Sequence, residues 1–332
     1  MSRGCLFALL ACLAHASIAH AQELAVEISQ SVGGTSEEIV GAGTQVRLLG
    51  DVGPRFRFGV EGAWGHRTQG TSDVLGAAYP YGGRADLIEA YAEYTVPSRR
   101  GIRSIRGGRY RTPFGFSAAS DHAYIGFLRP PLIRYGDYYA LSSGYLEHGV
   151  DVVVGAPRLW GEVSVGRPAD VGEAIRRPGT DTVLRAQGAI GALIVGASYL
   201  DTTPYLPSTF ARGRARFGGV DARWMQGGVL VRGEWIGGRP FDGTSTTGGY
   251  VDLIVHRPSM GPVTALARAE RLDYATVSPY ALYTHRYTVA GRVRVWQGFG
   301  VSTGVSHQGG QLTQSRRTAV DLGLSYTLRK DY

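Results

Sequence analysis

Apolar and polar residues alternate along most of this chain. In the stretch PRFRFGVEGAWGHR, Phe56, Phe58 and Val60 alternate with Arg57 and Glu61. The stretches DLIEAYAEYTV and HRYTVAGRVRVW repeat the pattern. A period of two residues places each set on its own face of a β-strand. One face is apolar enough to meet lipid and the other is too charged for a dry core, so the pattern predicts strands between lipid and water.

About sixteen such segments occur, with lengths near the 9–11 residues of a membrane-spanning strand. They cover residues 24–32, 40–50, 55–66, 86–96, 102–111, 145–155, 159–167, 181–188, 191–200, 213–225, 228–237, 249–257, 262–273, 284–296, 299–308 and 317–329. The pair Gly218-Gly219 interrupts the alternation in its segment, and we expect a β-bulge there.

The connections between the segments alternate in length. After even-numbered segments they are tight, as in GDVGP, PSRRG and QGG, and after odd-numbered segments they are generally longer and polar. Outer-membrane barrels have short periplasmic turns and longer external loops, whereas a soluble β-sandwich gives no reason for this rhythm. The sequence therefore predicts an all-β fold, a 16-stranded antiparallel transmembrane β-barrel with both termini in the periplasm.

The last segment, TAVDLGLSYTLRKDY, is also amphipathic. Leu322, Leu324 and Tyr326 are expected to face lipid while this strand closes the barrel against the first one, which removes the unpaired edges. The terminal aromatic Tyr332 resembles the signal that the outer-membrane assembly machinery reads in a C-terminal strand, although Lys330 departs from that pattern.

The first residues, MSRGCLFALLACLAHASIAHAQ, have a basic start, a short apolar stretch and an Ala-His-Ala site. This predicts a cleaved secretory signal peptide at 1–21 and an outer-membrane barrel at 22–332. A lipoprotein signal at Cys12 is the alternative, but its apolar stretch is too short and it leaves Ala-His-Ala unused.

Composition narrows the class further. Both cysteines, Cys5 and Cys12, lie in the leader, so disulfide-stapled small domains are excluded. The mature chain has 34 basic and 27 acidic residues, a formal charge of +7, and its one lysine is Lys330. Nearly every cation is therefore an arginine, which can bind carboxylates or phosphates with two parallel hydrogen bonds. After the leader, no apolar run is long enough for a transmembrane helix.

The longest connection runs from Thr112 to Gly144, between the fifth and sixth segments. Such a long loop is usually functional or disordered, and this one is rich in aromatic residues that can anchor it. We expect it to fold into the barrel and narrow the channel, with four charged residues at the constriction: Asp121, Arg129, Arg134 and Asp137. The alternative is a loop packed over the rim or against a neighbouring subunit.

Three short stretches, IRGGRYRTPFGF, FLRPP and LARAERLDYA, carry a resemblance to known proteins. The chain resembles the general bacterial porins and, more narrowly, the phosphate-selective porins and their relatives. The resemblance implies a homotrimer, a third external loop that folds inward, and Arg106, Arg109 and Arg111 at or below the narrowest point. The absence of lysine before position 330 argues against phosphate specificity.

The predicted inner wall carries both signs of charge. Its candidates include Arg55, Arg57, Glu89, Arg268, Glu270, Arg292 and Arg294. Facing ladders of Arg and Glu are the usual way in which a wet wall satisfies its polar groups. Clustered basic residues at a narrow point select anions, and the arginines from Arg106 to Arg111 with Arg129 and Arg134 form the best cluster. We expect a weak preference for anions.

Other functions have weaker support. Ser120, Asp121 and His122 are neighbours in sequence, and adjacent residues rarely share one face, so we expect no catalytic residues and no enzyme. No Cys/His spacing suggests a metal, no cofactor motif occurs, and the dispersed basic residues do not predict a nucleic-acid partner. We therefore expect a passive channel for small anions and other small polar solutes, with its outer face in contact with outer-membrane lipid. The alternatives are a closed structural or adhesive barrel and an outer-membrane hydrolase.

Overall fold

The computed structural model describes eleven stretches of the chain. They are residues 23–36, 40–68, 84–96, 101–116, 127–134, 146–169, 179–203, 214–239, 245–275, 281–311 and 317–332. The predicted signal peptide lies outside these residues.

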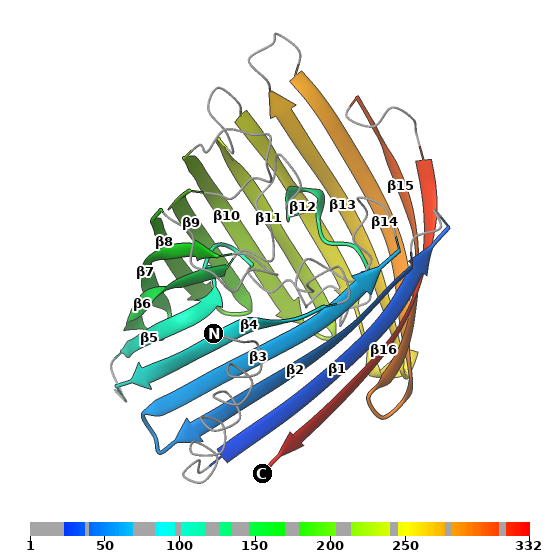
Figure 1. Cartoon of the computed structure of the whole chain (residues 1–332). Coiled ribbons are helices and arrows are strands. Elements are labelled where there is room, and N and C mark those ends of the chain that lie inside the picture. Colours follow the sequence, from blue (N-terminus) through cyan, green and yellow to red (C-terminus); the bar gives the residue numbers. More distant parts are fainter. Residues whose placement is uncertain are drawn as a thin grey trace.

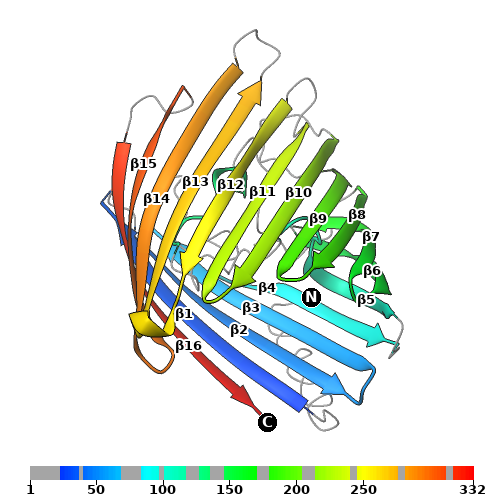
Figure 2. The same ribbon diagram turned by 180° about the vertical axis from the view of Figure 1, so that it is seen from behind.

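The described residues form sixteen antiparallel strands in one closed barrel (Figure 1). The strands are β1 (Glu23–Thr35), β2 (Val40–Val52), β3 (Phe56–Arg67), β4 (Arg84–Thr95), β5 (Ile102–Arg111), β6 (Leu146–Ala156), β7 (Leu159–Ala169), β8 (Asp181–Ile190), β9 (Leu193–Thr202), β10 (Ala215–Gln226), β11 (Val229–Arg239), β12 (Ser245–Val255), β13 (Val263–Ala275), β14 (Ala281–Trp296), β15 (Phe299–Gly310) and β16 (Arg317–Asp331). Each strand pairs with its neighbours in sequence, and β1 pairs with β16, as the view from behind also shows (Figure 2). The predicted fold class is confirmed.

The two faces of the barrel differ as the alternation predicts. Large apolar side chains such as Val220, Trp235 and Leu322 are exposed on the outer face. The intervening positions point inward and carry charged residues, among them Asp221 and Asp321, which are buried. Closure pairs β1 with β16, so the first and last strands do not leave their edges open to lipid.

The bulge expected at Gly218-Gly219 is wrong. Both glycines keep a regular register, with Gly218 opposite Gly237 and Gly219 opposite Ile236. A Cβ on Gly219 would lie 3.1 Å from the Phe114 ring, so this glycine makes room inside the barrel rather than bending the strand. The register shifts lie elsewhere, at Glu61/Gly62 between β3 and β4 and at Arg294/Trp296 between β14 and β15.

Helical structure in the described residues is limited to two 3₁₀ turns, η1 (Leu132–Arg134) and η2 (Pro258–Met260). Within these residues, no helix has the length and apolar character required to cross a membrane.

Candidate functional site

The end of β5 leaves the barrel wall. Its pairing with β4 stops at Ala90 opposite Arg109, although β4 begins at Arg84, while β5 stays paired with β6 as far as Arg111. By its position in the alternation, Arg111 would face outward. Because β5 has left β4, its side chain instead contacts Glu61 on the inner face of β3. The chain turns into the barrel at this point.

Arg111 is held inside the barrel by two carboxylates. Its guanidinium lies 2.5 Å from a Glu61 oxygen and 2.6 Å from a Glu89 oxygen. Arg47 on β2 also binds Glu61, at 2.6 Å. Because the positive and negative groups are matched and largely buried, this cluster fixes the entry of the loop and adds little net charge to the interior.

Residues 112–116 cross the interior to the opposite wall. Phe114 is 1% exposed and packs in an apolar cluster with Leu200, Phe217 and Ile236. The backbone N–H of Gly115 donates to Ser198 Oγ on β9 (3.1 Å) and that of Phe116 to Glu234 Oε1 on β11 (2.9 Å). Strands β3 and β11 lie half the ring apart, so this segment bridges the barrel.

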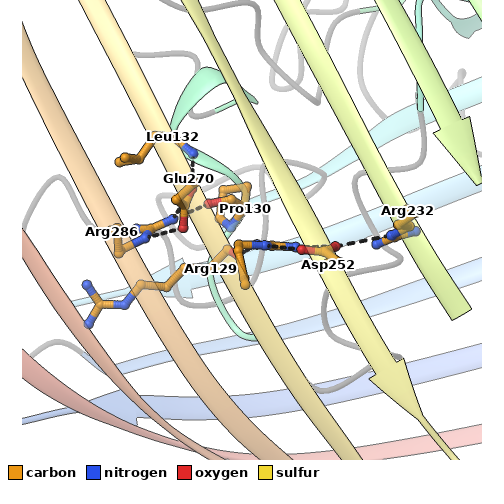
Figure 3. Close-up of polar contacts among 8 residues, drawn as sticks. Arg129, Pro130, Leu132, Arg232, Asp252, Glu270 and Arg286 are labelled. Carbon is orange, nitrogen blue, oxygen red and sulfur yellow. Dashed lines mark hydrogen bonds and ion pairs between the residues drawn. The ribbon is translucent and has the colours of Figure 1, made fainter. Parts of the chain in front are cut away.

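A second part of the same connection, residues 127–134, lies against β12 to β16 (Figure 3). Its main chain is held by three wall residues. The carbonyl of Arg129 accepts from Arg268 Nη1 (3.0 Å), and that of Pro130 from Arg286 Nη2 (2.6 Å). The N–H of Leu132 donates to Glu270 Oε2 (2.6 Å).

Side chains strengthen this attachment. Arg129 donates to both oxygens of Asp321 on β16, at 2.7 and 2.9 Å, and to Thr35 Oγ1 on β1, at 2.9 Å. The guanidinium of Arg268 lies 4.1 Å from the centre of the Phe127 ring. Figure 3 shows the main-chain part of this attachment, where Pro130 and Leu132 meet Arg286 and Glu270.

The wall itself is balanced in charge. Asp252 accepts from Arg268, at 2.6 and 2.8 Å, and from Arg232, at 3.1 Å. Arg286 donates to both oxygens of Glu270, at 2.7 and 3.2 Å. These cations are therefore already partnered, and they serve to hold the loop.

The predicted constriction residues have different environments. Arg106 lies 2.8 Å from an Asp151 oxygen and 3.6 Å from a Glu162 oxygen on the inner wall. Arg109 donates to the carbonyl of Ile88 (2.9 Å) and contacts His148.

Several predicted residues lie outside the described part of the chain. These are Asp121, Asp137 and the run from Ser120 to His122, and only the backbone of Arg134 is described.

The predicted wall residues mostly lie on the inner face. Arg57 binds Asp51 (2.8 Å), Arg292 donates to Ser325 Oγ (3.3 Å), and Arg294 is exposed. Glu89, Arg268 and Glu270 belong to the clusters described above.

The prediction for Arg55 needs correction. It precedes β3 and donates to the hydroxyl of Tyr94 (3.4 Å), whose ring packs against Phe56 on the outer face. Arg55 therefore lies at the rim, because the alternation that predicted its direction begins only at Phe56.

Sequence reasoning did not identify the residues that anchor the loop. These are Asp252, Arg286 and Asp321, with Ser198 and Glu234 for the first segment. Their inward parity was visible, but their partners depend on where the loop meets the wall. Among the described residues, no group of three or more His, Cys, Asp or Glu is arranged to hold a metal ion.

Comparison with known proteins identifies the fold. No protein-family model matches the chain, and no curated protein does. Among solved structures, OprB of Pseudomonas putida has a TM-score of 0.67 at 7% identity, covering 95% of this chain and 96% of its own. OmpT of Vibrio cholerae in its trimer form has a TM-score of 0.59 at 10% identity, with 92% and 98% covered. An anion-selective porin from Comamonas acidovorans has a TM-score of 0.60 at 10% identity, again with 92% and 98% covered. The chain has the fold of bacterial outer-membrane porins.

Proposed function

We propose that this protein is a porin of the bacterial outer membrane, a passive channel for small polar solutes rather than an enzyme. The observation that carries the proposal is the pair of segments, 112–116 and 127–134, held against the polar inner face of a closed barrel. Such segments narrow a water-filled lumen without closing the wall around it. The likeness to solved porins supports the same function, and assembly as a homotrimer belongs to the proposal.

A weak preference for anions is the second part of the proposal, and it depends on different arginines from those in the loop clusters. Arg111 and Arg129 are matched by carboxylates, so their net field in the lumen is small. Arg223 and Arg294 share the inward parity of Asp221 and Arg292, are exposed, and have no ion pair with a carboxylate among the described residues. Glu27 and Glu93 are partly exposed on the inner face elsewhere, which is why the preference should be weak.

Reversal potentials in a planar lipid bilayer under a salt gradient test both parts. We expect discrete conductance steps and an anion-selective potential from the folded protein. In the double variant Arg223→Gln with Arg294→Gln, the ratio of anion to cation permeability should fall toward one, because two inner-face cations are lost. Arg103→Gln, which removes an exposed charge of the outer face, is the control and should leave the ratio unchanged.

The possible failures are separable. Steps with cation preference would retain the channel and reject the role of Arg223 and Arg294. The absence of steps from a barrel that still migrates as a folded, heat-modifiable species would reject the channel itself.

A further inference from the structure

Three arginines gather on the outer face at the end of the barrel where β9 passes to β10 and β11 to β12, the upper end in Figure 1. They are Arg214, Arg216 and Arg239, and all three are exposed. Their direction follows from the alternation: Val220 on β10 and Trp235 on β11 share their parity and are exposed outer-face residues. These arginines therefore point away from the lumen, and the proposed channel does not use them.

The register places two of these cations side by side. Arg216 is directly opposite Arg239 in the pairing of β10 with β11, and like charges at such positions destabilise a sheet. One carboxylate, Asp201 on β9, lies 2.5 Å from Arg214 and 3.3 Å from Arg216. Within the part of the chain that the structure describes, Arg239 contacts no carboxylate. Among the described residues, three guanidinium groups thus share one carboxylate, so this part of the outer face carries a net positive charge.

The outer surface has an open position at Gly218, on the membrane side of this arginine pair, whereas Gly237 beside it has the Thr247 side chain close by. Gly218 lies opposite Gly237 and on its other side opposite Tyr199. A Cβ placed on Gly218 would have no atom within 4 Å, so the position is open. Tyr199 and Trp235, both exposed, stand beside this position. Aromatic rings of this kind mark the level of lipid headgroups in membrane proteins.

We propose that Arg216 and Arg239 bind the phosphate group of a membrane lipid, whose acyl chain lies over Gly218 between Tyr199 and Trp235. Guanidinium groups bind phosphate through paired charge-assisted hydrogen bonds. The phosphate supplies negative charge beside the paired cations Arg216 and Arg239. The open position at Gly218 lies next to them in depth and accommodates the apolar acyl chain. The proposal rests on the outer-membrane location given under the proposed function.

Binding of lipid A, a phosphorylated glycolipid, to the folded barrel in detergent tests this assignment by native mass spectrometry. The double variant Arg216→Gln with Arg239→Gln should bind lipid A about ten-fold more weakly or worse, since it loses charge-assisted hydrogen bonds. Arg271→Gln is the matched control. Arg271 has its own carboxylate in Asp273, at 2.7 Å, so its loss should leave affinity unchanged.

The open position at Gly218 has a separate test. Gly218→Leu fills this position and should weaken binding of lipid A, but not binding of the deacylated, phosphorylated headgroup. Undiminished binding of lipid A by the double arginine variant, or an equal loss in Arg271→Gln, would overturn the proposal. Inorganic phosphate binding as tightly as lipid A would assign the site to free phosphate and overturn the lipid.

Conductance distinguishes this proposal from the channel. The arginine pair lies on the outer face, so the double variant should keep the single-channel conductance and selectivity of the unchanged protein. If the protein does not conduct, and the double variant still weakens lipid A binding, the channel is rejected and the lipid site is retained. If the protein conducts but does not bind lipid A, the lipid site is rejected and the channel is retained.

Discussion

Asp252 lies between two inner-wall arginines and is itself 0% exposed. We expect Asp252→Asn to destabilise the barrel by about 3–5 kcal/mol, because it removes the buried carboxylate that Arg268 and Arg232 share. Chemical unfolding in lipid vesicles measures the change. Asp273→Asn is the control, since Asp273 pairs with Arg271 on the exposed surface. Asp273→Asn should lower the free energy of unfolding by less than about 1 kcal/mol. Equal losses in the two variants would show that the buried ion cluster stabilises the barrel no more than the exposed pair does.

Phe114 joins the first loop segment to the far wall. Phe114→Ala should destabilise the barrel by about 3–5 kcal/mol, because it opens a cavity in a packed cluster. Freed from its anchor, the segment should also add current noise to the open channel. Phe56→Ala is the control: Phe56 is 53% exposed on the outer face, so lipid replaces most of its contacts and the loss should be less than half as large. If Phe114→Ala changed neither the stability of the barrel nor the current noise, the loop would be held by its hydrogen bonds alone.

The strands could be predicted from the sequence because a membrane barrel imposes one rule at every position. Slipping by one residue would turn every charge into lipid, so the alternation specifies each strand within a few residues of its observed ends. β5 is the instructive exception. Arg109 and Arg111 have outward parity there, yet Arg111 reaches Glu61 inside because the strand leaves β4. No local sequence pattern predicts that β5 separates from β4.

The charge partners could not be predicted for a related reason. Asp321 and Arg129 are 192 positions apart, and they meet only because the loop folds across the barrel to its closing seam. Sequence parity gives the direction of a wall residue, whereas its partner depends on strand register and loop path together. Of the arginines predicted to select anions, Arg106, Arg111 and Arg129 each bind a carboxylate of the wall.

The loop also joins the two ends of the chain. Arg129 bonds to Thr35 on β1 and Asp321 on β16, the two strands that close the barrel. Leu128 packs over the same seam, since a Cβ on Gly323 would lie 2.6 Å from its Cδ2. Within the described residues, the segment therefore acts as an inner clamp on the closure.

Arg129→Met should loosen that seam specifically. The change leaves Asp321 buried without its cation, at a cost of about 3–5 kcal/mol, and local opening should follow the contacts that are lost. Amide hydrogen exchange, read peptide by peptide, should rise most in β1 and β16. Arg185→Met is the matched control, because Arg185 is an equally buried arginine bound to Asp221 on β10 (3.0 Å) and far from the seam. Its effect should concentrate in β8 to β10, whereas the same exchange pattern in both variants would show that the barrel opens as one unit and that the clamp is not local.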